Sequence, residues 1–190
     1  RTFALLIRSP HTTQLLVGVA LALAVLILYQ SSLRNGFINY DDPAYVTSNL
    51  HVRQGISWAN VSWAFSTTME ANWHPVTWIS HMADVEFFGM TPSGHHLTNV
   101  ILHLCNVVLL FLLLHKTTGC LPQSAVVAAL FALHPLNVES VAWVSDRKSL
   151  LCTLFMLLAF WAYGSYAWRK GAASYLGVIL FFGLGLMSKP

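Results

Sequence analysis

The sequence predicts an all-α, polytopic helical membrane protein with about five transmembrane spans and a long outer first loop. Apolar residues make up 56% of the 190 residues and charged residues only 9%, whereas an average soluble domain has roughly 25% charged residues. All seven acidic residues fall between Asp41 and Asp146, and none interrupts a long apolar run. Lipid is therefore the solvent that most of the chain is expected to meet.

The first span is predicted at residues 14–32, which carry no charge. About 20 residues of helix, at 1.5 Å each, cross a hydrocarbon core of roughly 30 Å. The apolar part is too long for a cleaved signal peptide, and no small-x-small cleavage site follows it. Because Arg1 and Arg8 precede this span, the positive-inside rule places the N-terminus in the cytoplasm.

Residues 34–96 are expected to form a polar and aromatic loop on the outer side. Ser57 can cap a helix that runs through Phe65, and Pro75 suits the first turn of a second helix ending near Gly89. We expect both short helices to lie in the membrane interface, the depth that tryptophan prefers. Four of the seven tryptophans fall in this loop: Trp58, Trp63, Trp73 and Trp78. One face of the second helix carries Trp78, Met82 and Val85.

The remaining apolar runs predict four further spans, at residues 97–115, 122–134, 150–168 and 172–187. The run at 122–134 is the shortest, and about 12 residues give only about 18 Å of helix. It either crosses the membrane with an extension past Pro135, or re-enters on the side from which it came. The pairs Arg147-Lys148 and Arg169-Lys170 balance under the charge rule, so both topologies stay open.

Two adjacent carboxylates, Asp41 and Asp42, lie about ten residues beyond the first span. Adjacent like charges oppose each other's ionisation, which makes a poised general base plausible at this position. The alternative is a solvated turn, because Asn39, the two aspartates and Pro43 are all residue types that favour turns.

A second group of ionisable residues joins the third and fourth apolar runs. Such groups are costly near hydrocarbon, so they usually pair with one another or act on a ligand. The alternative is an interfacial loop in which Asp146 pairs with its neighbours. A full crossing of the third run would place this loop beside Asp41 and Asp42, facing one cavity. The residues concerned are His134, Glu139, Asp146, Arg147 and Lys148.

A polar stripe runs along the second span and must face the bundle interior or water. Its members fall within an arc of about 80° on a helix. His96 and His103 are two turns apart, about 10 Å, too far to share an ion at about 2 Å from each ligand. We therefore expect interhelical hydrogen bonds, and no metal site. The stripe consists of His96, Asn99, His103 and Asn106.

Four stretches resemble a known family, and the match as a whole covers about residues 34–190. The chain looks like the N-terminal membrane part of bacterial tetratricopeptide-repeat membrane proteins. These are similar to the eukaryotic transmembrane and tetratricopeptide-repeat protein O-mannosyltransferases of the glycosyltransferase C superfamily. The stretches are Phe37-x-Asn39-Tyr40-Asp41-Asp42, Asn72-Trp73-His74-Pro75-x-Thr77-Trp78-x-Ser80-His81, Gly94-His95-His96-Leu97-Thr98-Asn99 and Leu133-His134-Pro135-Leu136-Asn137-Val138-Glu139-Ser140-Val141-Ala142-Trp143-Val144.

The resemblance implies a sugar donor on a polyprenyl phosphate and an acceptor hydroxyl, on protein or glycan, at the outer membrane face. Asp41 or Asp42 would be the general base of this transfer. Arg147 and Lys148 would stabilise the departing phosphate, with His134, Glu139 and Asp146 also on the substrate side. Relatives often carry Glu where this chain has Asp146. Further spans and a repeat domain are expected beyond residue 190, and the chain alone is expected to be inactive.

Two other functional classes compete with a glycosyltransferase. A transporter would use the polar stripe as its lining, and a non-catalytic scaffold would leave binding to a repeat domain. A transporter favours ionisable groups at the membrane midplane, whereas here they cluster at the interface. The net charge of +3 is small and dispersed, so nucleic acid is not an expected partner. No cofactor is implied with certainty, a divalent metal is possible, and the preferred location is the bacterial inner membrane, or the endoplasmic reticulum membrane in a eukaryote.

Overall fold

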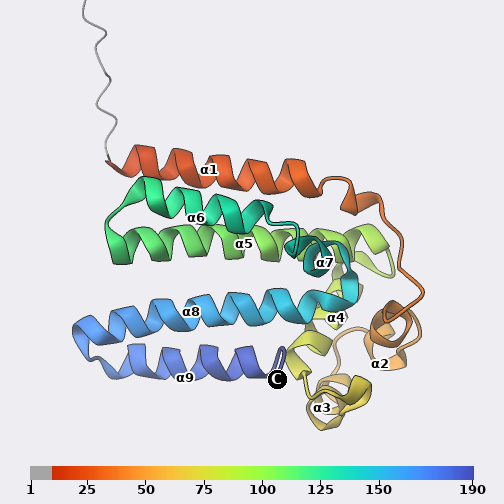
Figure 1. Cartoon of the computed structure of the whole chain (residues 1–190). Coiled ribbons are helices and arrows are strands. Elements are labelled where there is room, and N and C mark those ends of the chain that lie inside the picture. The colour runs from red at the N-terminus through yellow and green to blue at the C-terminus, as the bar shows by residue number, and fades with distance from the viewer. Residues whose placement is uncertain (1–9) are drawn as a thin grey trace, which may run out of the picture.

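A computed structural model describes residues 10–190, and within this range it contains helices and no strands. Arg1 and Arg8, which oriented the first span, lie outside the described residues. Figure 1 shows a bundle of long helices with a group of short helices at one end. The bundle consists of α1 (Pro10–Tyr29), α5 (Pro92–Thr118), α6 (Leu121–Leu133), α7 (Asn137–Ala142), α8 (Arg147–Arg169) and α9 (Ala172–Leu186).

Three stretches are long and apolar enough to cross a membrane: His11–Tyr29, Pro92–Thr118 and Val144–Arg169. The helices α6 and α9 are apolar but shorter, with 13 and 15 residues. The predicted all-α membrane class is therefore confirmed. The first helix begins four residues before the predicted position and ends at Tyr29, because Ser32–Arg34 form a separate 3-10 turn.

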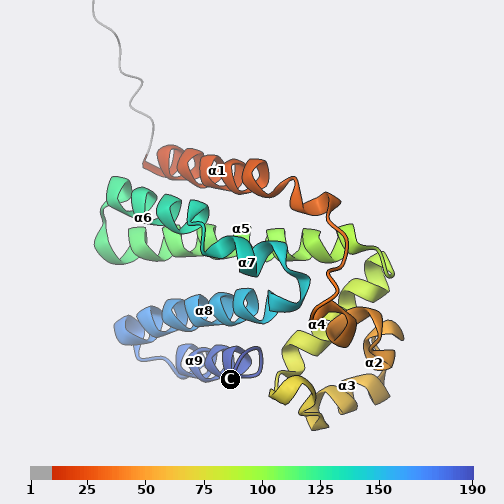
Figure 2. The ribbon, with the colours of Figure 1, turned by 45° about the vertical axis from the view of Figure 1, so that its right-hand side comes forward.

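The short α6 reaches only part of the way along α5 and is continued by α7 (Figures 1 and 2). Helix α6 ends where His134 adopts an extended conformation, as is expected of a residue that precedes proline. After the turn, α7 and the 3-10 turn Val144–Asp146 lead into α8 at the end of the bundle that carries the short helices. The chain thus runs the length of α5 in two pieces joined at Pro135.

The outer loop forms a small subdomain with its own apolar core, built from η2 (Pro43–Thr47), α2 (Leu50–Arg53), α3 (Trp58–Ser66), η3 (Met69–Ala71) and α4 (Pro75–Phe88). The two helices predicted here are confirmed, including the Ser57 cap, which accepts a hydrogen bond from the Asn60 backbone N–H. Pro75 occupies the first turn of α4 and Gly89 ends it with a positive φ of 63°, as their conformational preferences favour.

The core of this subdomain contains Tyr45, Val46, Val52, Ala64, Trp78, Met82 and Val144. Trp78 and Met82, on the shared face of α4, are both fully buried there. Their face therefore packs against the subdomain itself rather than against lipid. Trp58, by contrast, is 86% exposed. Val144 comes from the segment before α8, so the same core attaches the outer loop to the bundle.

Replacing Trp78 by Ala should lower the free energy of unfolding by about 3–5 kcal/mol, because it leaves a large cavity in this core. The measurement is thermal denaturation of the purified protein, followed by loss of the monodisperse peak in size-exclusion chromatography. Trp58→Ala is the matched control and should change stability little. Equal destabilisation by the two variants would contradict the packing described here.

Candidate functional site

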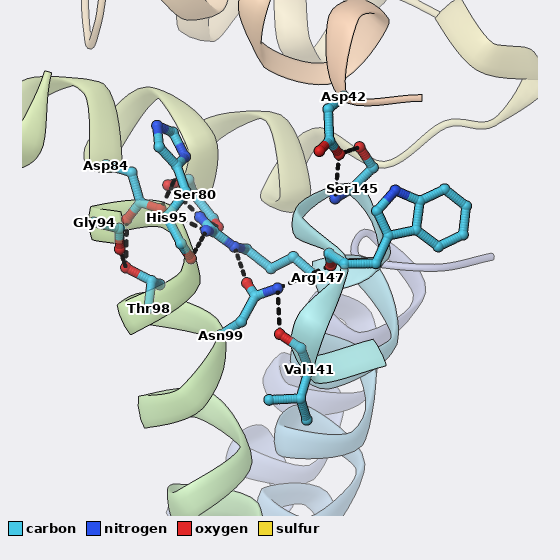
Figure 3. Close-up of polar contacts among 11 residues, drawn as sticks. Asp42, Ser80, Asp84, Gly94, His95, Thr98, Asn99, Val141, Ser145 and Arg147 are labelled. Carbon is cyan, nitrogen blue, oxygen red and sulfur yellow. Dashed lines mark hydrogen bonds and ion pairs between the residues drawn. The ribbon is translucent and has the colours of Figure 1, made fainter. Parts of the chain in front are cut away.

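Asp42 joins the outer loop to the segment that precedes α8. Its side chain is only 1% exposed. One carboxylate oxygen accepts a hydrogen bond from the Ser145 backbone N–H at 3.2 Å and another from the Ser145 hydroxyl. The other oxygen accepts from the Ile38 backbone N–H at 2.8 Å. Figure 3 shows Asp42 above the Ser145 turn.

This contact places the two acidic motifs at the same end of the bundle, although they are 103 residues apart in sequence. A re-entrant third run would have put them on opposite sides of the membrane. The contact between Asp42 and Ser145 is compatible with a full crossing, in which the apolar run at 122–134 is extended past Pro135.

Arg147 is fully buried and makes an ion pair with Asp84 of α4, with 2.5 Å between guanidinium and carboxylate. Every nitrogen of its guanidinium has a partner within the protein (Figure 3). Nε donates to the Asn99 side chain at 2.8 Å, Nη1 donates to the backbone and side-chain oxygens of Ser80, and Nη2 also donates to the His95 carbonyl at 2.8 Å. Arg147 therefore ties α8 to α4 and α5.

Asp84 has two further neighbours on α5. The Thr98 hydroxyl donates to one carboxylate oxygen at 2.6 Å, and His95 Nδ1 lies 3.2 Å from the other. His81, Asp84 and His95 place potential metal-binding atoms within 4.8 Å of one another. Arg147 already neutralises Asp84 there, so a divalent cation would bring excess positive charge into a buried position, which is unfavourable.

The four residues of the polar stripe are all buried in the bundle. The Asn99 amide donates to the carbonyls of Val141 and Trp143, at 3.4 and 3.0 Å. The Asn106 amide donates to the Leu150 carbonyl at 3.0 Å. His103 Nε2 lies 3.2 Å from the Ala132 carbonyl, and the His96 ring is enclosed as well. The expected interhelical hydrogen bonds thus form at Asn99, His103 and Asn106, where they hold α5 to α6, α7 and α8, whereas neither ring nitrogen of His96 has a hydrogen-bond partner among the described residues.

Lys148 is half-buried beside Tyr45 of the outer loop. Its ammonium group lies 3.1 Å from the Tyr45 hydroxyl and 4.7 Å from the centre of the ring. Burial raises the pKa of that hydroxyl, and the carboxylates of Glu70, Asp41 and Asp146 raise it further. Tyr45 is therefore uncharged at neutral pH.

The histidines of the second motif are buried within the subdomain. The His74 ring stacks on Tyr45 and on Trp78, with ring centres 5.5 and 4.7 Å apart. Burial, and then the charge of Lys148, lowers the pKa of His74 to about 4. Burial and the nearby Arg147 also lower the pKa of His81. Both rings are therefore neutral at pH 7 and leave Lys148 and Arg147 as the local cations.

The other predicted site residues divide into two groups. Asp146 is nearly buried and accepts hydrogen bonds from the hydroxyls of Ser140 and Ser149, at 2.6 and 2.9 Å. His134 and Glu139 are exposed, and His134 Nδ1 accepts the Leu136 backbone N–H at 3.2 Å. The structure thus brings Asp146 and Lys148 close to the Asp41-Asp42 motif, while the side chains of His134 and Glu139 point to the exterior.

Sequence reasoning did not single out Asp84, the ion-pair partner of Arg147, and it placed Ser80 only within the second of the four stretches. Their spacing of four residues places both on one face of the helix predicted after Pro75. The sequence feature that could have pointed to Asp84 is a carboxylate on an aromatic-rich helix. An acid buried in such surroundings needs a cationic partner. The sequence alone did not identify which arginine or lysine that partner is.

Replacing Asp84 by Asn or Arg147 by Met should each destabilise the protein by about 3–5 kcal/mol, because each leaves an unpaired buried charge. The double variant should lose less than the sum of the two, which a double-mutant cycle of thermal or denaturant unfolding measures. Glu86→Gln changes an exposed acid of the same helix and serves as control. If the double variant lost as much free energy of unfolding as the two single variants together, the ion pair between Asp84 and Arg147 would be contradicted.

The comparisons with known proteins agree with the motifs. The chain is 34% identical to protein O-mannosyl-transferase TMTC1 of Mus musculus over 167 residues, covering 82% of this chain and 18% of that protein. It is 29% identical to Tmtc1 of Drosophila melanogaster over 170 residues, covering 86% and 20%. With human TMTC3 the identity is 30% over 156 residues, covering 78% and 16%.

The chain thus spans about one fifth of the length of these curated relatives. No protein-family model and no solved structure matches it. The likeness to the O-mannosyltransferases inferred from the four motifs is confirmed: over about four fifths of its length, this chain is similar to the TMTC protein O-mannosyl-transferases. The bacterial origin stays a prediction.

Proposed function

We propose that this chain forms part of a membrane glycosyltransferase that moves a sugar, taken as mannose from the relatives' names, from a polyprenyl phosphate to a protein hydroxyl. The observation that carries the proposal is the contact between Asp42 and Ser145. It brings the acidic motif of the outer loop beside the turn that leads to Lys148. A proton acceptor and a phosphate-binding cation are thereby gathered at one end of the bundle, where a lipid-borne donor can reach them.

Asp41 is the general base in this proposal. The Asp42 carboxylate is buried and already accepts three hydrogen bonds within the protein, so its role is to position the loop. Asp41 is partly exposed and can take the proton of the acceptor hydroxyl. The acceptor oxygen then forms a bond to the anomeric carbon as the bond to the phosphate oxygen breaks. The electron pair of the broken bond leaves with the phosphate.

Lys148 is the cation that stabilises the departing phosphate. Its side chain is partly exposed, and no carboxylate of the described residues lies within ion-pair distance of it. Arg147, which the resemblance assigned to the same task, is engaged at every nitrogen by the protein. We assign Arg147 the role of positioning residue: it fixes the first turn of α8, from which Lys148 projects.

The proposed reaction takes place at the outer face of a membrane, with the bacterial inner membrane as the preferred location. The polar stripe supports an enzyme over a transporter, since its amides bond to carbonyls of neighbouring helices rather than lining an open path. A scaffold would share the fold and the buried network but would have no use for a partly exposed carboxylate next to the contact between Asp42 and Ser145.

In the full-length protein, Asp41→Asn should reduce transfer of mannose from a polyprenyl phosphate by about 10²–10⁴-fold, the usual range for a general base. The protein should stay as stable as the wild type. Asp42→Asn should lower the melting temperature, because it replaces the carboxylate that receives Ser145 and Ile38. Transfer is measured with radiolabelled donor and a protein acceptor.

The matched control is Glu70→Gln, an exposed acid of the same loop, which should retain full transfer. Undiminished activity of the Asp41→Asn protein would remove Asp41 from the mechanism. A folded wild-type protein that never transfers the sugar would refute the enzyme and favour the scaffold.

A further inference from the structure

A cavity lies between α5, α8 and α9 at the end of the bundle farthest from the outer loop. Its volume is about 650 Å³. Helix α5 ends at this level, and α8 turns into α9 there (Figures 1 and 2). The lining combines two cations, two hydroxyls, an indole and a glycine: Lys116, Gly164, Ser165, Trp168, Arg169 and Ser174. The cavity therefore offers polar groups at one end of helices that are otherwise apolar.

The two cations of this cavity have no acidic partner. Lys116 belongs to the last turn of α5 and Arg169 to the last turn of α8. No acidic residue occurs in residues 92–138 or 147–190, and no carboxylate of the described residues lies within ion-pair distance of either cation. Like charges that line one cavity repel each other unless an anion lies between them. The cavity thus has a positive charge that no side chain of its own helices compensates.

Two tryptophans of α8 indicate the depth of the cavity in the membrane. The Lys116 ammonium group lies 4.2 Å from the centre of the Trp161 ring, a cation–π contact that holds it beside α8. Trp168, which lines the cavity, is 91% exposed. Exposed tryptophans favour the level of the lipid headgroups, where one edge of the indole is wet. The cavity is therefore expected to lie at headgroup level.

The first turn of α9 adds hydrogen-bond donors to the two cations. Ser174 lines the cavity from this turn, and no side chain caps the N-terminus of α9. The first backbone N–H groups of a helix have no partner within the helix, and their partial positive charge favours an anion. Donors of this kind, together with a lysine and an arginine, match the oxygens of a phosphate group.

We propose that this cavity binds the headgroup of an anionic phospholipid of the cytoplasmic leaflet, with Lys116 and Arg169 binding its phosphate. The charge rule places the N-terminus in the cytoplasm, so the end of the bundle opposite the outer loop faces the cytoplasm as well. Basic pockets between membrane helices on that side bind anionic headgroups. The site is at the opposite end of the bundle from Asp41 and Lys148, so the inference is independent of the proposed sugar transfer.

A lipid fits this position better than a soluble anion. Exposed apolar side chains of α8 and α9, among them Tyr163 and Leu176, lie close in sequence to the residues that line the cavity, and acyl chains can pack on them. These chains keep the lipid phosphate at headgroup level, which gives it a high effective concentration at the cavity. The bound phosphate would connect α5 to α8 and α9 at an end of the bundle where no carboxylate does so.

The test is lipid binding to the purified full-length protein, titrated by native mass spectrometry with phosphatidylglycerol and with phosphatidylcholine of the same acyl chains. The wild type should bind phosphatidylglycerol more tightly. Lys116→Gln and Arg169→Gln should each weaken that binding about fivefold, the effect of one basic residue near an anionic surface. Gly164→Phe should weaken it too, because the ring would occupy the cavity, and a Cβ at this position meets no other segment within 4 Å.

The matched controls lie away from the cavity. Arg53→Gln changes an exposed cation of α2 in the outer loop, and Gly18→Phe changes an equally open glycine of α1. Both variants should bind phosphatidylglycerol as the wild type does. Inorganic phosphate at millimolar concentration should not displace the lipid.

Unchanged phosphatidylglycerol binding in both Lys116→Gln and Arg169→Gln would overturn the inference and leave these cations a role in membrane orientation alone. Equal binding of phosphatidylcholine by the wild type would also overturn it, because the headgroup charge would then not be recognised. Displacement by inorganic phosphate would identify a site for a soluble anion instead. If Gly164→Phe fails to fold, the two charge variants decide, since both alter exposed side chains.

Discussion

The structure depends on one buried ion pair, between Arg147 at the start of α8 and Asp84 near the end of α4. Both side chains are almost entirely removed from solvent, so either charge alone would be strongly unfavourable. The pair therefore allows only arrangements in which the outer-loop subdomain is seated against α5 and α8. Asn99, Ser80 and the His95 carbonyl occupy the remaining donors of the guanidinium and make the orientation of α8 specific.

This constraint divides the charged residues into two sets with different roles. Asp42, Asp84 and Arg147 are buried and form their hydrogen bonds with other groups of the protein. These bonds position the outer loop and the first turn of α8. Asp41 and Lys148 are partly exposed at the same end of the bundle. The proposed proton acceptor and phosphate-binding cation need such exposure, because each must touch a substrate. The buried set supplies the rigid frame that holds the exposed set in place.

Much of this fold could be predicted from local sequence features. Long uncharged runs identified the helices, and Ser57, Pro75 and Gly89 marked the ends of two helices in the outer loop, because capping and turn preferences act within a few residues. The stripe on α5 was predictable for the same reason: helical periodicity puts its four members on one face.

Contacts between distant segments could not be predicted in this way. The match of Arg147 to Asp84 and the insertion of Asp42 into the Ser145 turn each join residues on different elements. The local sequence around each of these residues does not indicate which distant residue it contacts. The short run at 122–134 shows the same limit, since its length alone favoured neither topology, whereas the contact of Asp42 with Ser145 is compatible with a full crossing. The core of the outer loop was also missed, because η2, α2 and η3 are too short to show a helical period.

The most direct test of the account is whether the Asp42 loop meets the Ser145 turn in the membrane. Cysteines placed at Asp42 and Ser145 of the otherwise cysteine-free full-length protein should be joined within one molecule by a short thiol cross-linker, measured as protection from a mass-tagging maleimide. A pair at Asp42 and Lys116, at the opposite end of the bundle, should not be joined. Failure of the first pair to cross-link in native membranes, with both cysteines reactive, would contradict the shared site and the mechanism built on it.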